Sequence, residues 1–384
     1  MKIAFVYDAV YPWIKGGAEK RIYELGKRMA RMGHEVHLFG IKWWDGPDMI
    51  KYEGMTLHGV CAGMELYVKG RRSIIEALIF ATGLFTHLFR EKFDIIDVSA
   101  FPYFPCFTVK LISILKKSPM IITWHEVWGD YWFEYLGAGG VFGKVVEYLV
   151  SKLVSLHFAV SAMTGKNLGI LGVRCKNIRI LPNGIDSRLI AKIAPSEEAC
   201  DVIFAGRLIK EKNIDMLLEA ISIVRKSMPD IKCHVIGEGP EKERLMRSAA
   251  ELGILSNVRF SGFMEYDKMI SRIKSTKVLA LPSGREGFGI IVIEAFACGV
   301  PVVTVRDGKN AASMLVGKET GLVVDADAWE LSVAILKLVE DSDLREKMAR
   351  SAIETSRNYD WDNIIRRVLL LYENVITSHK LQEI

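Results

Sequence analysis

The sequence predicts an α/β protein with two Rossmann-like domains, and three observations support this prediction. The chain has 384 residues, which is too long for a single hydrophobic core of ordinary size. Two domains of about 150–200 residues are therefore expected. Apolar runs of strand length alternate with segments of helical length, as in a mainly parallel sheet that helices cover on both faces. Glycine-rich loops follow several predicted strands, where open α/β sheets bind ligands. We expect the first domain to end near residue 190.

The chain opens with a strand, a glycine-rich loop, a helix and a second strand. The strand Ile3–Asp8 leads into a loop with Gly16 and Gly17, followed by the helix Glu19–Met32 and the strand Val36–Ile41. This order is typical of a Rossmann-like unit. The full dinucleotide pattern GxGxxG is absent, so the loop gives little support for NAD binding.

A histidine and a dense group of aromatic residues follow the predicted strand 120–123. His125 lies just past the carboxyl end of that strand, where ligands bind in open sheets, although a lone histidine is more often a core residue. Six Trp, Tyr and Phe residues lie between 124 and 135, too many for a plain amphipathic helix. They form either part of the core or a platform for an apolar acceptor.

The second half begins with a strand that is followed by two cations. After the strand Asp201–Ala205 come Gly206, Arg207 and Lys212, just before a predicted helix at 214–225. Two cations in this position could bind a diphosphate through charge-assisted hydrogen bonds, although alone they would be ordinary surface charges.

Residues 281–303 read LPSGREGFGIIVIEAFACGVPVV and predict a strand, a glycine-rich loop, a short helix and another strand. The helix Ile290–Cys298 is followed by Gly299 as a C-terminal cap and by Pro301. A glycine-rich loop that opens a helix presents backbone N–H groups to an anion. Glu286 and Glu294 flank this predicted anion site.

These motifs resemble those of family 4 retaining glycosyltransferases, which have the GT-B fold. The residues that carry the resemblance are EGFG with the trailing EAFACGVPVV, KGGAE at 15–19, His125-Glu126, PNGID at 182–186 and GRL-x3-K-N from Gly206. The resemblance covers nearly the whole chain and is thin between 42 and 92. It implies an acceptor domain at 1–190 and a donor domain at 191–362, facing each other across a cleft. A C-terminal helix at 363–384 would cross back to the first domain.

The resemblance also implies an activity and roles for the site residues. A hexose would pass from a UDP- or GDP-sugar to a glycan or lipid-linked acceptor, with retention of configuration. Arg207, Lys212 and the helix amides after Gly287 would stabilise the leaving diphosphate, Glu286 would hold the hexose and His125 would orient it. The catalytic residues expected are His125, Glu286, Arg207 and Lys212. The donor-binding residues expected are Gly16, Gly17, Arg207, Lys212, Gly237, Phe263, Gly287, Phe288, Gly289, Ile290 and Glu294, the last of these at the nucleotide ribose.

No cofactor and no metal are expected. Asp325 and Asp327 resemble the DxD of metal-dependent glycosyltransferases, but they lie beyond the last strand, where an acidic cap of the helix Trp329–Leu338 is expected. Three alternatives remain, namely a related epimerase, a phosphorylase with pyridoxal phosphate, and a non-catalytic partner subunit. A nucleic-acid partner is not expected, because no recognition motif accompanies the basic first half.

The composition predicts a cytoplasmic protein. The six cysteines lie far apart without a CxxC pair, as in reduced cytosolic proteins. The segment Met1–Val6 runs straight into a strand, so no signal peptide is expected.

One apolar segment, at 74–89, suggests a membrane surface. It is about 16 residues long and contains Glu76, so it is too short and too interrupted for a span. Residues 1–190 hold 24 Lys and Arg against 17 Asp and Glu. The segment is therefore either a buried helix or part of a peripheral contact with an anionic cytoplasmic membrane face. The basic residues that bracket it are Lys69, Arg71, Arg72, Arg90 and Lys92.

Overall fold

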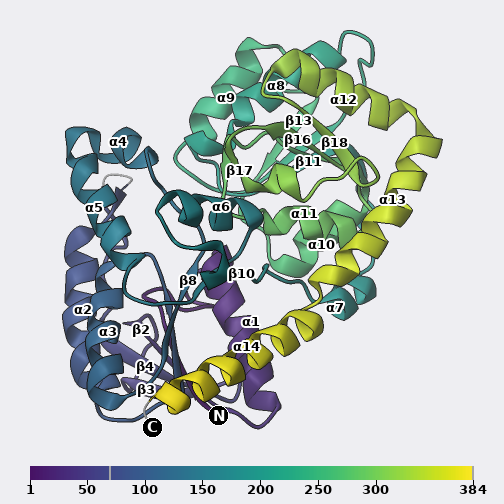
Figure 1. Cartoon of the computed structure of the whole chain (residues 1–384). Coiled ribbons are helices and arrows are strands. Elements are labelled where there is room, and N and C mark those ends of the chain that lie inside the picture. The colour runs from purple at the N-terminus through teal and green to yellow at the C-terminus, as the bar shows by residue number, and fades with distance from the viewer. Residues whose placement is uncertain (69–70, 383–384) are drawn as a thin grey trace. The chain divides into compact units, whose positions relative to one another are not determined.

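The computed structural model describes residues 1–68 and 71–382, and its chain forms two compact units (Figure 1). The first unit contains Met1–Asn183 and Trp361–Ile384, and the second contains Gly184–Asp360. The corresponding boundaries predicted from the sequence lie after residue 190 and before residue 363. Lys69 and the side chain of Arg71, both expected to contribute to a basic surface, lie outside the described residues.

The first unit is built on an eight-stranded sheet in the order β10-β9-β8-β7-β1-β2-β4-β3. Its paired strands run parallel, except that β3 is antiparallel to β4. This confirms the mainly parallel sheet that the sequence predicts. The strands are β1 (Lys2–Val6), β2 (Glu35–Lys42), β3 (Met49–Tyr52), β4 (Met55–Ala62), β7 (Ile95–Ser99), β8 (Met120–Trp124), β9 (His157–Ala159) and β10 (Ile178–Ile180), with a separate hairpin of β5 (Tyr67–Val68) and β6 (Arg71–Arg72).

Helices cover both faces of this sheet because successive strand residues point to opposite sides. Ala4 and Val6 of β1 pack in one core cluster with residues of α2, α3, α5 and α6, whereas Ile3 and Phe5 pack in another with α1 and α14. The helices are α1 (Gly17–Arg31), α2 (Ile74–Leu88), α3 (Phe104–Lys116), α4 (Tyr131–Leu136), α5 (Gly140–Val150), α6 (Ala162–Ile170) and α14 (Trp361–Gln382).

The C-terminal helix belongs to the first unit, as predicted. Trp361, Ile364 and Tyr372 of α14 are at most 1% exposed and lie in the same core cluster as Ile22 and Met29 of α1. The apolar face of α14 is therefore buried against a sheet that the chain left at residue 183.

The second unit has a six-stranded parallel sheet in the order β13-β12-β11-β14-β16-β18. Its strands are β11 (Cys200–Ala205), β12 (Cys233–Ile236), β13 (Val258–Ser261), β14 (Thr276–Leu281), β16 (Val302–Arg306) and β18 (Gly321–Asp325), with a small parallel pair of β15 (Arg285–Glu286) and β17 (Lys309–Asn310). Its helices are α7 (Ser187–Lys192), α8 (Ile214–Val224), α9 (Lys242–Glu251), α10 (Tyr266–Lys274), α11 (Ile290–Ala297), α12 (Ala328–Glu340) and α13 (Ser342–Ser356).

Each sheet has one point at which the strand order reverses. In the first unit the chain builds outward from β1 in one direction and from β7 in the other, and in the second unit it does so from β11 and β14. The loops after these two strands diverge to opposite faces and leave a crevice at the carboxyl edge, which is where open α/β sheets bind ligands. If the predicted site residues bind a ligand, they should lie at the carboxyl edge near one of these two strand reversals.

Candidate active site

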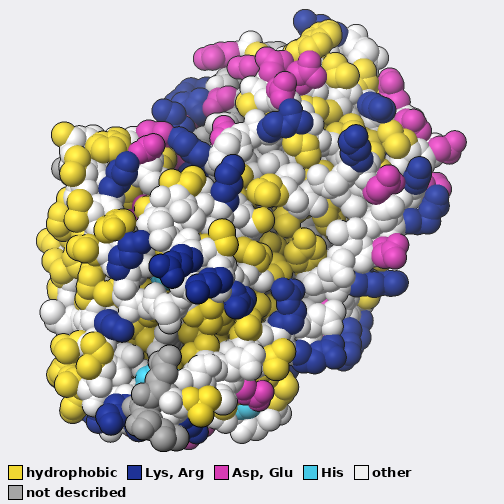
Figure 2. Space-filling view, viewed as in Figure 1, with side chains coloured by type: hydrophobic (Ala, Val, Ile, Leu, Met, Phe, Trp, Pro, Cys, Tyr) yellow, Lys and Arg dark blue, Asp and Glu magenta, His cyan; other side chains and the backbone are white. Residues whose placement is uncertain are grey.

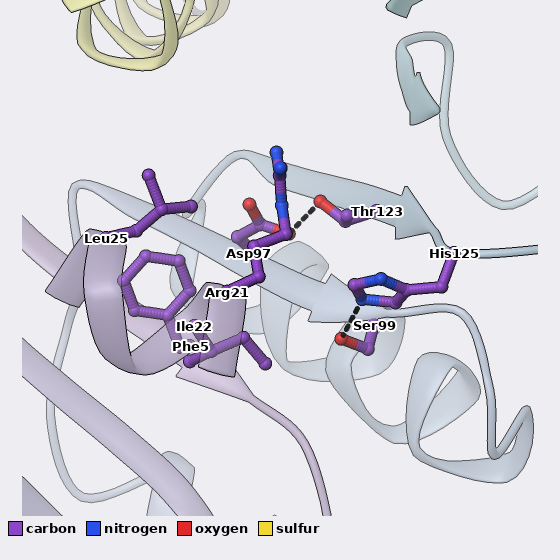
Figure 3. A pocket seen from close by; sticks show the side chains of 8 residues that line it. All are labelled: Phe5, Arg21, Ile22, Leu25, Asp97, Ser99, Thr123 and His125. Atoms are coloured by element: carbon purple, nitrogen blue, oxygen red, sulfur yellow. Dashed lines mark hydrogen bonds between the residues drawn. The ribbon is translucent and has the colours of Figure 1, made fainter. Parts of the chain in front are cut away.

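His125 lines a small cavity at the carboxyl edge of the first sheet (Figure 3). It follows β8, and its Nε2 lies 3.3 Å from Oγ of Ser99, at the end of β7. The cavity has a volume of about 10 Å³, close to the room that one water molecule needs. The remaining lining comes from Phe5, Arg21, Ile22, Leu25, Asp97 and Thr123.

A buried network of polar side chains forms the floor of this cavity. Asp97 of β7 accepts hydrogen bonds from Thr123 Oγ1 at 2.7 Å and from Tyr372 Oη at 2.5 Å. Burial raises the pKa of Asp97, while these two hydrogen bonds and the nearby Arg21 guanidinium lower it. The network thus joins α14 to two strands at the edge where ligands are expected.

Arg21 reaches this network from α1 and is only 2% exposed. Its Nη1 donates to the carbonyl oxygen of Pro182 at 2.5 Å and to Oδ1 of Asn183 at 3.3 Å. Burial lowers the pKa of Arg21 to about 10, and the Asp97 carboxyl opposes that shift. The PNGID segment therefore contacts the same cavity network as the helix after the KGGAE loop.

His125 is neutral at physiological pH in this environment. Desolvation of its ring and the charge of Arg21 lower the pKa of His125 to about 3. A neutral imidazole offers one N–H donor and one acceptor nitrogen, so it can orient a hydroxyl by a hydrogen bond. It does not supply a proton as an imidazolium acid would.

Arg21, Asp97 and Ser99 also line this site, although the sequence motifs did not point to them. A signal was present for Asp97, which is the one charged residue in the apolar strand IIDVS. Arg21 carried a weaker signal, because a basic residue at a buried helical position requires a partner. Ser99 carried none, since serine is common at strand ends.

In the second unit the structure brings Lys212 and Glu286 into direct contact. Nζ of Lys212 is ion-paired with Oε1 of Glu286, which also accepts a hydrogen bond from Ser283 Oγ at 3.0 Å. Lys212 ends a short 3₁₀ turn after β11, and Glu286 follows β14, so both lie at the strand reversal. Arg207 also follows β11; it is exposed and has no ion pair within the described part of the chain.

The glycine-rich loop before α11 is shaped by its glycines. Gly289, the N-cap of α11, has a φ of +94°, and a Cβ there would lie 2.6 Å from Cβ of Ala312. Only glycine fits this left-handed and crowded position. Phe288 is 5% exposed, with its ring 6.0 Å from that of Tyr359, so its side chain belongs to the packing under the loop. Gly287 and Ile290 are partly exposed, and Glu294 is buried within α11.

The other predicted donor-binding residues lie on separate loops. A Cβ at Gly237 would lie 1.9 Å from the carbonyl oxygen of Gly206, so the loops after β12 and β11 meet backbone to backbone. Phe263 follows β13 and is 55% exposed. Gly16 and Gly17 begin α1 in the first unit and are exposed.

Asp325 and Asp327 form an ion pair and a helix cap, respectively. Oδ1 of Asp327 accepts from the amides of Trp329 at 2.8 Å and Glu330 at 3.2 Å, which confirms the predicted helix cap. Asp325 forms an exposed ion pair with Arg306 at 3.0 Å.

One group of metal-type ligands, unexpected from the sequence, occurs among the described residues. His37 Nδ1 lies 2.8 Å from His58 Nε2, and Glu91 is their neighbour. The ammonium of Lys2 is ion-paired with Glu91 and with Glu35, which also bonds His37. The imidazoles are thus satisfied as a hydrogen-bonded pair near the amino end of β2, at the opposite edge from His125.

The aromatic residues of the segment 124–135 are divided between the core and the surface. Trp124 is fully buried and Trp132 is 6% exposed, whereas Phe133 is 42% exposed. The segment 74–89 is likewise divided, since α2 buries Phe80 and Leu84 and exposes several other apolar side chains. Within 1–68 and 71–382, no helix is both long and apolar enough to cross a membrane.

The surface position predicted for Arg72 is wrong. Arg72 was expected to face an anionic surface, but its side chain is 11% exposed and ion-paired with buried Asp8. It compensates the charge of a carboxylate at the end of β1 and is not available to a membrane.

Comparison with known proteins gives two family matches that divide the chain between them. Glycosyltransferase Family 4 matches residues 15–189, and Glycosyl transferases group 1 matches residues 186–355. The D-inositol 3-phosphate glycosyltransferase of Acidothermus cellulolyticus is 29% identical over 230 residues, which are 55% of this chain and 51% of that protein. The chain spans about half the length of the first curated relatives that it matches.

Two further similarities extend over nearly the whole chain. One subunit of the phosphatidylinositol N-acetylglucosaminyltransferase of Arabidopsis thaliana is 21% identical over 396 residues, covering 98% of this chain and 82% of that protein. The crystal structure of Anabaena Alr3699/HepE in complex with UDP has a TM-score of 0.76 at 19% identity. It covers 97% of this chain and 100% of that chain, and this likeness shows the shared fold.

Proposed function

The chain belongs to the family 4 glycosyltransferases, which have the GT-B fold, and from this premise we propose a specific reaction. The protein transfers a hexose from a nucleotide diphosphate sugar to a lipid-linked acceptor, with retention of configuration and without a metal ion. The donor is a UDP- or GDP-sugar; the solved relative that holds UDP favours the uridine nucleotide.

The contact between Lys212 and Glu286 at the strand reversal of the second unit carries this proposal. A cation and a carboxylate held together at that position can bind the diphosphate and the hexose of a nucleotide sugar, respectively. Lys212 and Arg207 stabilise the diphosphate, while Glu286 accepts hydrogen bonds from hexose hydroxyls. The first amides of α11 add N–H donors that the helix itself leaves unpaired.

The chemical barrier is the negative charge that develops on the departing diphosphate. Fixed cations and amides stabilise such charge without reorganising during the reaction. Two cations at the strand reversal make a metal ion unnecessary, and Asp327 is already committed to capping α12. His125, being neutral, orients a hydroxyl of the transferred sugar, and the leaving phosphate accepts the acceptor proton.

The acceptor is proposed to be lipid-linked because of the surface of the first unit. α2 exposes Ile74, Ile75 and Leu78 by 43–70%, and α5 exposes Val141 and Phe142 by more than half. Figure 2 shows hydrophobic side chains gathered along the side where Figure 1 draws α2, α4 and α5. A soluble protein rarely leaves such a patch uncovered. The enzyme would therefore work as a peripheral protein on the cytoplasmic membrane face.

The proposal is tested by incubating the protein with a panel of UDP- and GDP-sugars, each with vesicles of phosphatidylinositol or of a polyprenyl phosphate, or with soluble inositol phosphate. Mass spectrometry should detect a hexosylated lipid for one donor, and NMR of the product should show the donor's anomeric configuration. Transfer only to the soluble acceptor would contradict the lipid acceptor. Isomerised nucleotide sugar without transfer would indicate an epimerase, and a pyridoxal absorption band a phosphorylase.

A further inference from the structure

A second cavity, distinct from that at His125, lies in the first unit between α2, α4, α5 and the start of α3. Its volume is about 80 Å³, several times what one water molecule needs. Apolar side chains dominate the lining, which includes Ile74, Ala77, Phe101, Trp132, Tyr135 and Phe142. Water gains few hydrogen bonds from such walls, so the cavity suits an apolar occupant.

The cavity borders the exposed apolar face. Ile74 and Phe142 both line the cavity and are more than half exposed, at 51% and 57%. From this mouth the exposed apolar residues continue along α2 to Ile75 and Leu78 and along α5 to Val145 and Leu149. An apolar chain that enters from this face would remain in contact with apolar side chains.

Trp132 is a buried aromatic side chain of the cavity wall. Its side chain lines the cavity and is 6% exposed, and its Nε1–H has no hydrogen-bond partner within the described residues. A buried donor without an acceptor costs about 1–3 kcal/mol, so such groups normally have a partner.

Lysines at the edge of the face favour a membrane lipid over a protein partner. Nζ of Lys144 lies 5.3 Å from the ring centre of Phe133, Nζ of Lys152 lies 4.7 Å from that of Tyr148, and Lys116 is similarly placed over Phe89. Aromatic rings with ammonium groups above them suit the boundary between acyl chains and anionic headgroups.

We propose that this cavity holds one hydrocarbon chain of a membrane lipid while the exposed apolar face lies on the bilayer. The inference deepens the proposed function, on which it rests for the identification of that lipid as the acceptor. Burial of the chain would lift one lipid partly out of the bilayer and fix its position relative to the first unit.

The test uses the full chain with anionic vesicles that contain a phospholipid carrying a diazirine in its acyl chain. After photolysis, peptide mass spectrometry should find label on cavity residues, including Trp132 and Ala77. Ala77→Phe, which places a ring in the cavity, should lower this label at least about tenfold. The matched control is Ala138→Phe, because Ala138 is exposed between α4 and α5 and does not line the cavity. In this variant the cavity residues should carry as much label as they do in the unmodified protein.

A second variant keeps the test decisive if Ala77→Phe folds poorly. Ala77→Leu adds a smaller apolar side chain to the same wall of the cavity, so it should lower the label on cavity residues several-fold. Label confined to Ile75, Leu78 and other outer residues would overturn the inference, as would an unlabelled cavity in a protein that ultracentrifugation shows to be dimeric. Transfer to lipid with an unlabelled cavity would overturn the inference alone. A labelled cavity without any transfer would support the inference and refute the proposed function.

Discussion

Lys212 and Glu286 are 74 residues apart in the chain, yet their charged atoms are in contact. Their side chains are only 16% and 12% exposed, so this ion pair is more than a surface contact. An anion that enters the site competes with Glu286 for Lys212, and the hydroxyls of a sugar can replace the hydrogen bonds that Glu286 loses. One bound donor would thus satisfy both residues at once, which neither a free phosphate nor a free sugar can do.

We predict that Arg207→Ala and Lys212→Ala each lower kcat/KM about 100- to 1,000-fold, because a preorganised donor to a developing anion contributes about 3–4 kcal/mol. Steady-state kinetics with the preferred nucleotide sugar would measure this, with circular dichroism to verify the fold. Lys210→Ala is the control, since Lys210 is an exposed lysine of the same turn. Full activity in either variant would remove that residue from the site.

Glu76 is predicted to make the stability of the first unit depend on pH. It is 1% exposed, and burial, then the neighbouring Asp8 carboxyl, raise its pKa to about 8 against the opposing charge of Arg72. The folded state therefore keeps a proton that the unfolded state loses above about pH 4.5. The free energy of unfolding should fall as pH rises from about 4.5 through about 8, by at most about 1.4 kcal/mol per pH unit.

The measurement is urea unfolding from pH 5 to pH 9. Glu76→Gln should remove this decline, because an amide does not titrate. Glu65→Gln, at an exposed position, should keep it. An identical pH profile for Glu76→Gln and the unmodified protein would contradict the assignment.

At the scale of elements, the sequence predicted the strands and helices that repeat a regular pattern. The apolar strand β1, the helix α11 with its glycine cap and the Asp327 cap of α12 were all expected, because each depends on residues close in sequence. No strand was predicted between residues 42 and 92. β4 reads MTLHGVCA and mixes polar with apolar residues, so its burial comes from neighbours that local sequence does not reveal.

The residues of the candidate site likewise fall into those that sequence motifs predict and those that only the fold brings together. Glu286 and Lys212 could be named from motifs, and the structure places them together. Arg21, Asp97 and Tyr372 could not be grouped, because their contacts join β7 to helices from opposite ends of the chain. The residues of α2 could be seen to be apolar, but only packing separates its buried face from its exposed one.

The hydrogen bond from α14 to β7 gives a prediction for this element. Tyr372→Phe should lower the free energy of unfolding by about 1–3 kcal/mol, because Asp97 stays buried and loses a donor. Urea denaturation would measure the loss, with Tyr148→Phe as the control at a half-exposed ring. An unchanged midpoint would mean that Asp97 finds another donor.

For the whole molecule, the proposed catalysis depends on cations and amides of the protein and on no metal ion. Transfer should therefore survive dialysis against EDTA with kcat/KM reduced less than about twofold. The assay is the mass-spectrometric transfer reaction, with and without added Mn²⁺ or Mg²⁺. Loss on chelation with rescue by either ion would bring Asp325 and Asp327 back as candidate ligands.

The last prediction concerns where the whole molecule works. Burial of one large apolar side chain contributes about 1.5–3 kcal/mol, and each lysine near an anionic surface about 1 kcal/mol more, screened by salt. The protein should therefore co-sediment with anionic vesicles more than with neutral ones, and salt should weaken the binding. Ile75→Asp, at a residue 70% exposed on α2, should lower the partition coefficient about tenfold or more.

The control for this variant is Ile353→Asp, since Ile353 is 42% exposed and belongs to the second unit, whereas the proposed face belongs to the first. It should bind vesicles as the unmodified protein does. Equal loss in both variants would show that any exposed apolar residue suffices and that α2 has no special part. Equal failure to bind anionic and neutral vesicles at low salt would favour a soluble acceptor, because the apolar face would then have no bilayer to meet.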